Sequence, residues 1–240
     1  MISDMSFSEV RLFGDIVASL ERMQGEVDVR HAILDDITTL LRAEYACSYV
    51  WDNEQKKFDK SYNKNISEQS SSNYKSWYQY HDPITFKMRE RGCAIASEII
   101  PYRKFYQTDY YQDVMKNEGM RYGINLYLFD RGRDIGDLRI WRGASGNDFE
   151  QRDKKILLLL QPYLTRSILR YEQANISTGS LTQREKEVAQ LVSKGLTDRE
   201  IARYLDISFS TVRTHLNKSL DKLNCANRAE LAVRYRHPNY

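Results

Sequence analysis

The stretch LTDREIARYLDISFSTVRTHL, residues 196–216, holds two short amphipathic segments separated by a tight break. The first segment begins with Thr197 and Glu200 at capping-box spacing, which predicts the start of a helix. In the second segment, Val212 and Leu216 are spaced to anchor a helix from behind. Its remaining positions carry hydrogen-bonding side chains where a buried helix would carry leucine, so we expect an exposed polar face.

Two further helical segments flank this stretch. Residues 181–195, LTQREKEVAQLVSKG, have Thr182 and Glu185 at capping-box spacing, and Gly195 is a typical helix stop. The last segment, NRAELAVRY, opens at Asn227. The sequence thus predicts four helices with a tight turn between the second and third, which is a helix-turn-helix whose second helix fits the major groove of DNA.

The outward side chains of residues 210–218 have the chemistry for reading DNA. Arg213 can donate two hydrogen bonds to guanine, Asn217 can pair with adenine, and Thr214 can offer its methyl group to thymine, so we predict these three as base readers. The predicted phosphate contacts are Thr197, Ser210, Thr211, His215 and Lys218. A neutral imidazole packed at the helix junction is an equal alternative for His215, and a helical packing module with a solvated polar face is the alternative for the whole segment.

The charge of the chain separates at a polar stretch, EQANISTGS, residues 172–180. Residues 180–240 hold 11 Lys and Arg against 7 Asp and Glu, whereas the rest of the chain holds 25 against 26. A basic module beside a nearly neutral one is typical of a nucleic-acid-binding domain. We therefore expect a regulatory domain over residues 1–172, a linker over 173–180, and a DNA-binding domain over 181–240.

Residues 181–232 resemble the LuxR-type (GerE-like) helix-turn-helix domain, because they match its pattern LTxRExEVxxLxxxGxTxxEIAxxLxISxxTVxxHxxxxxxKLxxxNRxEL almost throughout. The resemblance implies a transcription regulator that binds double-stranded DNA as a homodimer. It places Arg213, Thr214 and Asn217 at the base-reading positions and gives the dimer contact to the helix from Asn227 to about Tyr235. Family members often carry Lys or Arg where Asn217 stands, so base reading and phosphate contact both remain open for it.

Residues 1–172 alternate between helical and strand patterns. Ser6 and Glu9 open an amphipathic helix whose predicted apolar stripe is Phe7, Val10, Phe13, Val17 and Leu20, and a second such helix follows. Strand pairs are predicted within 45–63 and 122–142, with helices over 67–80 and 83–91 between them. A long helix that Pro162 interrupts closes the domain. This order predicts an α+β domain, an antiparallel sheet covered by helices, which resembles GAF- or PAS-like sensory domains.

Aromatic residues are concentrated between Tyr62 and Tyr111, where eleven occur. Their apolar bodies and polar tips suit a small-molecule pocket. Residues 74–86, YKSWYQYHDPITF, resemble the tyrosine-rich segment with Asp-Pro in acyl-homoserine-lactone receptors, and the predicted pocket residues are Trp77, Tyr80 and Asp82. Core packing or a dimer surface explains the aromatics equally well, and Asp82 also suits a helix cap.

The sequence lacks the patterns that would indicate several other classes of protein. No run of residues has the length and apolar character of a membrane span, and the first residues lack a signal-peptide pattern, so we expect a cytoplasmic protein. Three widely separated cysteines form neither a disulfide framework nor a zinc motif. Hydrolase, P-loop and dinucleotide motifs are absent, so we expect no enzyme, no metal and no required cofactor. Two alternatives remain. The protein is a regulator controlled by a small molecule, or it is a regulator whose first domain only dimerises or binds a protein.

Overall fold

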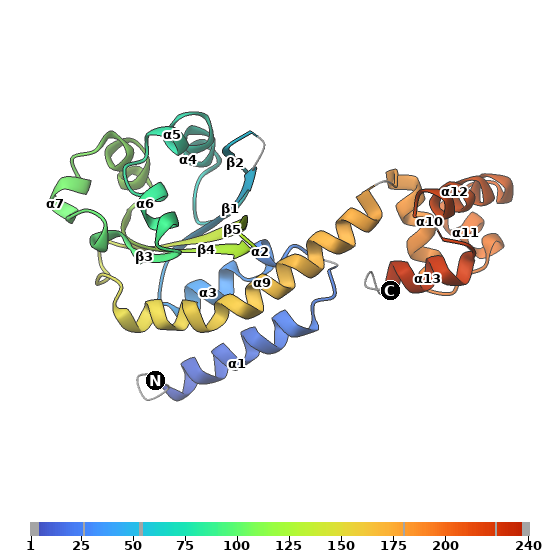
Figure 1. The fold of residues 1–240 in the computed structure, drawn as a ribbon, viewed down its shortest axis with the longest axis horizontal. Coiled ribbons are helices and arrows are strands. Elements are labelled where there is room, and N and C mark those ends of the chain that lie inside the picture. The colour runs from blue at the N-terminus through green and yellow to red at the C-terminus, as the bar shows by residue number, and fades with distance from the viewer. Residues whose placement is uncertain (1–4, 26, 53–54, 180, 224, 237–240) are drawn as a thin grey trace. The chain divides into compact units, whose positions relative to one another are not determined.

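The computed structural model describes residues 5–25, 27–52, 55–179, 181–223 and 225–236 (Figure 1). The chain divides into two compact units, one made of residues 1–23 and 27–168 and the other of residues 24–26 and 169–240. We refer to them as the N-terminal and C-terminal units. Their boundary falls within helix α9 (Gln151–Gly179), so residues 173–179 of the predicted linker are helical.

A five-stranded sheet forms the centre of the N-terminal unit, with strand order β2-β1-β5-β4-β3 and antiparallel neighbours throughout. The strands are β1 (Tyr45–Asp52), β2 (Lys57–Lys64), β3 (Cys93–Ile95), β4 (Met120–Asp130) and β5 (Arg133–Gly143). Both predicted strand pairs are present. The edge strand β3 was not predicted, because three residues are too few to show an alternating pattern.

The two faces of the sheet are covered by helices of very different length (Figure 1). One face carries α1 (Phe7–Arg22), α3 (Leu34–Leu40) and α9, with the single turn α2 (Val29–Ala32) close by. The other face carries short segments, in which α4 (Glu68–Asn73), η2 (Tyr74–Tyr78) and α5 (Gln79–His81) follow one another without a break, as do η4 (Tyr111–Met115) and α8 (Lys116–Glu118). The separate short segments are α6 (Thr85–Glu90), η3 (Ala96–Glu98) and α7 (Tyr102–Phe105).

Alternation along the strands assigns side chains to these two faces. In β5, Leu138 and Ile140 point to one face, while Asp137, Arg139 and Trp141 point to the other. Trp141 belongs to a buried cluster with aromatic residues of the short segments. The face under the short segments therefore combines aromatic rings with charged groups, and we refer to it as the aromatic face.

Helix α1 buries the predicted stripe only in part: Leu20 is buried, and Val10, Phe13 and Val17 are half-buried. The capping box of Ser6 and Glu9 is present, but the buried apolar residues are Ile16 and Leu20, and the Phe7 side chain is 86% exposed. Glu9 also lies inward and pairs with Arg42 and Arg152. The long helix also departs from prediction: α9 continues through Pro162, and Leu158, whose carbonyl loses its donor, is exposed, so water can solvate it.

Acid is expected to loosen α1 from the rest of the N-terminal unit. Burial alone would raise the pKa of Glu9, but hydrogen bonds from Ser6 and the ion pair with Arg152 outweigh it and lower the pKa to about 2. A carboxyl with a depressed pKa stabilises the fold above its unfolded value of 4.5, and this contribution is lost as the pH falls toward 2. The protection factors of α1 amides against hydrogen exchange should fall over that range in the wild type and already be low at pH 7 in Glu9→Gln.

The C-terminal unit contains the four predicted helices, α10 (Gln183–Ser193), α11 (Asp198–Leu205), α12 (Phe209–Lys222) and α13 (Arg228–Arg236). The capping boxes predicted at Thr182 and Thr197 are present. Helix α12 begins slightly earlier than expected, because Ser208 is its N-cap and accepts a hydrogen bond from the Thr211 N–H. A core of leucine, valine and isoleucine side chains joins the four helices.

Candidate functional sites

A tight turn sets helix α12 against α11. Asp206 adopts a left-handed conformation at the end of α11, and the Ile207 N–H donates to the Ala202 carbonyl at 3.0 Å. Behind α12, Val212 and Leu216 are buried in the core of the C-terminal unit. The apolar side of α12 is thus fixed, and its opposite side is left to solvent.

Three side chains on the exposed side of α12 have no partner within the described residues. Arg213, Asn217 and Lys218 are exposed and make no hydrogen bond or ion pair there. In contrast, Thr214 donates to the Ser210 carbonyl at 3.0 Å. Arg213 and Asn217, one turn apart, present free hydrogen-bond donors on one side of α12, and Lys218 beside Asn217 adds an ammonium group.

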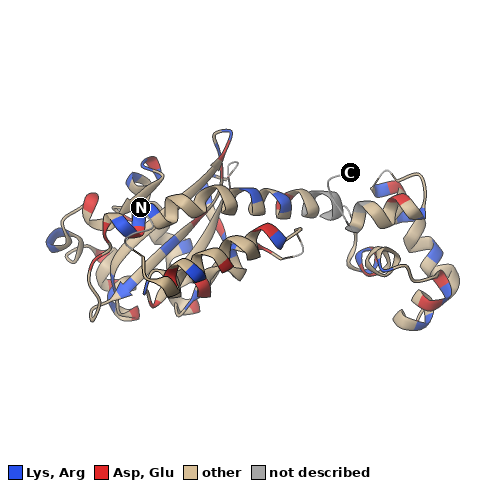
Figure 2. Ribbon diagram, turned by 90° about the horizontal axis from the view of Figure 1, so that it is seen from below, with Lys and Arg blue, Asp and Glu red and all other residues tan. Residues whose placement is uncertain are grey.

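The other predicted DNA contacts surround this face. Ser210 and Thr211 share hydrogen bonds with the N-cap Ser208, and the exposed Thr197 caps α11. His215 is half-buried, and its Nδ1 is buried without a hydrogen-bond partner. Each of these roles in DNA binding stays a prediction. Basic and acidic residues are interspersed along the helices of this unit (Figure 2).

Ion pairs hold α12 and α11 to their neighbours. Lys222 at the end of α12 lies 2.7 Å from the buried carboxylate of Glu185 on α10. Burial would raise the pKa of Glu185, but the hydrogen bonds from Lys222 and Thr182 lower it instead. The Arg184 guanidinium donates to the Leu205 carbonyl at 2.7 Å, which ties α10 to the end of α11. The exposed face of α12 is therefore carried on a rigid support.

The aromatic face of the N-terminal unit encloses a small cavity of about 20 Å³, which we refer to as the inner cavity. This volume holds about one water molecule. Its wall includes Cys47, Tyr49, Tyr74, Tyr110, Arg139 and Trp141. The cavity therefore lies between the sheet and the short segments.

The three predicted pocket residues occupy different environments. Trp77 is 58% exposed and stacks on His81 with ring centroids 3.9 Å apart, and Tyr80 is 53% exposed. Asp82 is buried and accepts hydrogen bonds from the Ile84 and Thr85 N–H groups, so it caps the start of α6. Burial raises the pKa of Asp82. Their roles in ligand binding stay predictions.

Two neighbouring tyrosines point inward instead. Tyr74 and Tyr78 are buried against Tyr110, with ring centroids 5.8 and 5.5 Å away. They belong to the π-helical turn η2. Tyr78 donates to Asp113, and this hydrogen bond raises the pKa of Tyr78 to about 12.

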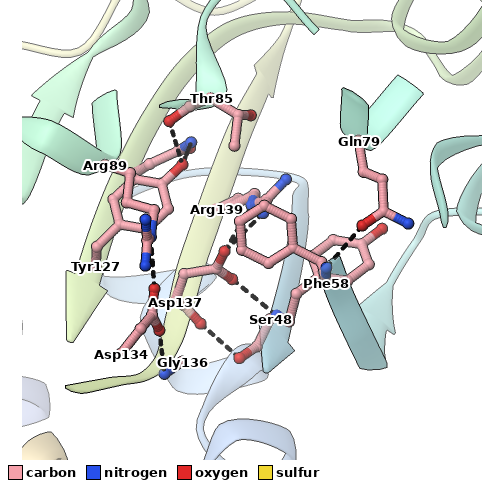
Figure 3. Close-up of polar contacts among 12 residues, drawn as sticks. Ser48, Phe58, Gln79, Thr85, Arg89, Tyr127, Asp134, Gly136, Asp137 and Arg139 are labelled. Atoms are coloured by element: carbon pink, nitrogen blue, oxygen red, sulfur yellow. Dashed lines mark hydrogen bonds and ion pairs between the residues drawn. The ribbon is translucent and has the colours of Figure 1, made fainter. Parts of the chain in front are cut away.

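A buried ion pair lies on the aromatic face, where the ladder between β1 and β5 ends (Figure 3). Past the last paired residues, Cys47 and Arg139, the Asp137 side chain accepts a hydrogen bond from the Tyr49 N–H at 2.7 Å. Its other oxygen, Oδ2, accepts from Arg139 Nε at 2.8 Å. Sequence reasoning missed this pair, although both residues were within a predicted strand.

The surroundings of the pair are largely aromatic. The Arg139 guanidinium carbon lies 4.6, 4.3 and 4.9 Å from the ring centroids of Tyr49, Phe58 and Tyr74. Burial would lower the pKa of Arg139, but Asp137 outweighs it and raises the pKa well above the usual value. Burial raises the pKa of Asp137 to about 6 against the opposing effect of Arg139. The pair is thus held in a low-dielectric site.

A second pair, Arg89 and Asp134, lies nearer the rim of the same face (Figure 3). Arg89 Nε lies 2.7 Å from Asp134 Oδ2, and the Arg89 side chain is 25% exposed. The Asp134 side chain also accepts from the Gly136 N–H at 2.9 Å. This pair provides a matched comparison for Asp137 and Arg139, because it has the same chemistry but reaches solvent.

Two larger hollows open on the surface of the N-terminal unit. The outer hollow, about 380 Å³, is lined by Trp77, Tyr78, Asp109 and Tyr110 among others, and Tyr110 also forms part of the inner cavity wall. The second, about 460 Å³, is the larger but is lined by charged groups that already pair with one another, such as Glu9 with Arg152 and Arg142 with Asp153. The outer hollow is therefore the better approach to a ligand site.

Gly123→Ala is expected to reshape the inner cavity. A Cβ atom on Gly123 would lie 2.2 Å from the Trp141 ring, so the ring has to move, and Trp141 lines the cavity. Overpacking of this kind costs about 1–3 kcal/mol. Thermal unfolding should show that loss, whereas Gly14→Ala, where a Cβ meets nothing within 4 Å, should show none.

The C-terminal unit matches a family model. Residues 179–235 fit the model of the bacterial regulatory proteins of the luxR family, GerE. The chain carries a LuxR-family helix-turn-helix domain. Helices α10, α11 and α12 lie within that match, so the free face of α12 belongs to the LuxR-family domain.

Curated relatives extend this result. The chain is 26% identical over 170 residues to the monoamine regulon transcriptional regulator of Klebsiella aerogenes, covering 71% of this chain and 74% of that protein. It is 41% identical over 58 residues to the HTH-type transcriptional regulator MalT of Vibrio campbellii, which is 24% of this chain but only 6% of MalT. Both relatives are transcriptional regulators by name.

Solved structures share the fold. SdiA in complex with octanoyl-rac-glycerol matches 97% of this chain and 96% of its own, with a TM-score of 0.51 and 21% identity. The GAF domain of a phosphoenolpyruvate-protein phosphotransferase from Coxiella burnetii matches 72% of this chain and 97% of its own, with a TM-score of 0.51 and 12% identity. The predicted fold, a GAF-like α+β unit followed by a helical LuxR-family domain, is confirmed.

Two findings concern metals and membranes. The described ranges contain no group of three or more His, Cys, Asp or Glu side chains arranged to hold a metal ion. Among the helices of the described residues, none combines the length and the apolar composition that crossing a bilayer requires.

Proposed function

We propose that this protein binds specific DNA sequences as a homodimer in the cytoplasm, with α12 in the major groove, and that a small molecule bound in the N-terminal unit controls it. The observation that carries DNA reading is the set of free donors on α12. Arg213, Asn217 and Lys218 are exposed without partners in the described chain, while Val212 and Leu216 fix the helix from behind. Such a helix suits the edges of bases in the major groove.

The roles on the proposed DNA interface follow from side-chain chemistry. Arg213, Thr214 and Asn217 face the bases, and Thr197, Ser210, Thr211 and Lys218 lie toward phosphates. The buried Nδ1 of His215 supports packing at the helix junction, and a phosphate contact is the other role proposed for this residue. In a dimer, two copies of α12 would address half-sites about one helical turn apart.

Selection of duplexes from a random pool by the full-length protein tests DNA reading. We expect enrichment of a pseudo-palindromic sequence with half-site centres about 10 base pairs apart. Retention of all sequences to the same extent, with affinity that depends only on salt, would contradict sequence-specific reading.

Several observations support a ligand site on the aromatic face. The inner cavity is lined by three tyrosines, a tryptophan and a buried arginine, a mixture of apolar surface and a few polar groups that suits small-molecule recognition. SdiA, which shares the fold, was solved with octanoyl-rac-glycerol. The inner cavity must enlarge to admit such a molecule.

The short segments provide the means to enlarge it. The separate short segments α6, η3 and α7 have few internal hydrogen bonds and open more readily than long helices. Tyr110 separates the inner cavity from the outer hollow, so its displacement would join the two spaces. A ligand would then enter past Tyr78 and Tyr110 and be enclosed by the short segments.

Native mass spectrometry of the protein purified from its own cells tests ligand control. A bound small molecule that leaves on denaturation is the expected result, and the same spectrum gives the oligomer mass. The competing function is a first unit that only dimerises or binds a protein; the exposed Phe7, Leu158 and Leu159 on α1 and α9 favour it. An unliganded dimer whose DNA affinity no cell extract of small molecules changes would support that alternative.

A further inference from the structure

The Arg139 guanidinium has more hydrogen-bond donors than its surroundings satisfy. Its side chain is 3% exposed, and it carries five N–H groups. Within the described residues it donates one hydrogen bond, from Nε to Asp137. Nη2 is in the ion pair with the same oxygen, 2.7 Å away, but makes no hydrogen bond within the described residues. A buried donor of this kind is costly and calls for a functional explanation.

The free donors border the inner cavity. Arg139 is part of the cavity wall, beside Tyr110 and Trp141. Asp137 occupies the Nε edge of the guanidinium, and the rings of Tyr49 and Phe58 contact its surface. The Nη groups are therefore what Arg139 can offer to a molecule in the cavity.

The charges around Arg139 favour a neutral hydrogen-bond acceptor in the ligand over an anionic one. Asp137 already compensates the positive charge of Arg139, and Asp82 is a further buried carboxyl in the same cluster. A second anion would enter a closed, low-dielectric site without a free positive charge to pair with, which is unfavourable. A neutral acceptor, such as a carbonyl oxygen, carries no such penalty.

We propose that Arg139 recognises the head group of the ligand by donating from its Nη groups to the carbonyl oxygen of a neutral acyl compound in the inner cavity. This rests on the proposed ligand site and adds to it the residue that reads the head group and the chemical class that it reads. Asp137 is a positioning residue, because it holds the guanidinium edge away from the cavity and neutralises its charge.

The test compares two probes that differ in one carbonyl. 1-Octanoyl-rac-glycerol and 1-O-octyl-rac-glycerol have the same chain length and the same glycerol head, but only the ester has the acyl carbonyl. Isothermal titration of the full-length protein should give at least about tenfold tighter binding of the ester, the size expected of a hydrogen bond from a charged donor.

Variants assign that preference to Arg139. The double variant Arg139→Met/Asp137→Asn removes the donors without leaving a buried charge, and Asn keeps an acceptor for the Tyr49 N–H; it should bind the two probes within about twofold of each other. The matched control Arg89→Met/Asp134→Asn should keep the preference of the wild type. Arg139→Lys retains the charge with fewer donors and should show a reduced preference, a second readout if the double variant does not fold.

Each other result overturns the proposal in a distinguishable way. Equal binding of ester and ether by the wild type would show that Arg139 has only a structural role, with the ligand site intact. Tighter binding of octanoate than of the ester would show that the site reads an anion. Binding of neither glycerol probe would overturn both this proposal and the proposed acyl ligand site.

Discussion

Replacing Arg139 alone with methionine is expected to lower the free energy of unfolding of the N-terminal unit by about 3–5 kcal/mol. Asp137 is 1% exposed, and Arg139 is the cation that compensates it. Without that cation, the carboxylate keeps only the Tyr49 N–H as a strong donor. It must then either stay ionised in an apolar site or take up a proton, and both cost stability at neutral pH.

Urea unfolding followed by tryptophan fluorescence measures this loss. Trp51, Trp77 and Trp141 are the three tryptophans of the chain and all belong to the N-terminal unit, so the signal reports on that unit alone. Arg139→Met/Asp137→Asn should recover most of the lost stability because it leaves no buried charge. The single variant should also be less impaired at pH 5 than at pH 8, since protonation of Asp137 removes the unpaired charge. If Arg139→Met lowered the free energy of unfolding by less than about 1 kcal/mol at both pH values, Asp137 and Arg139 would not form a buried ion pair of the kind described.

Arg213→Ala and Lys218→Ala are expected to weaken DNA binding in different ways. Arg213 addresses a base, so its loss should cost about 1–3 kcal/mol on the selected duplex and relax specificity at one position. Lys218 addresses a phosphate, so its loss should weaken binding to every sequence and reduce the salt slope by about one. Because the structure gives neither side chain a partner in the described residues, neither change should alter folding.

Fluorescence anisotropy on selected and scrambled duplexes, over a series of salt concentrations, separates the two effects. Lys194→Ala, which removes an exposed charge at the end of α10, is the matched control and should leave specificity unchanged. If Arg213→Ala lowered the affinity for both duplexes equally, the assignment of Arg213 as a base reader would be wrong. If Lys218→Ala left the salt dependence of the binding constant unchanged, the assignment of Lys218 as a phosphate contact would be wrong.

Local signals explain why much of the fold was predictable. The pairs Ser6 and Glu9, Thr182 and Glu185, and Thr197 and Glu200 each fix a helix start within four residues of sequence, and each forms its capping box in the structure. The two strand pairs show in the same way, because their alternation is long. Strand β3 and the single-turn helices depend on tertiary packing, which no short pattern reveals.

The aromatic face was harder to predict because two of its features break the rules of pattern analysis. Tyr74 and Tyr78 are buried while Trp77 and Tyr80 are exposed, and helical spacing alone does not distinguish these two pairs. Asp137 and Arg139 alternate with Leu138 and Ile140, a pattern typical of a strand with one face in water. Here both faces are covered, and only the pairing of the two charges makes their burial possible.

Because Cys47 lies in the wall of the inner cavity, its alkylation can report on opening of that cavity. The thiol is buried in the inner cavity wall, and burial raises its pKa to about 12, so almost no reactive thiolate exists while the fold is closed. Alkylation of Cys47 at neutral pH can then proceed only through molecules in which the short segments have lifted. The alkylation rate of Cys47 in the native protein, followed by peptide mass, therefore measures how often the aromatic face opens. A molecule that fills the inner cavity must lower this rate.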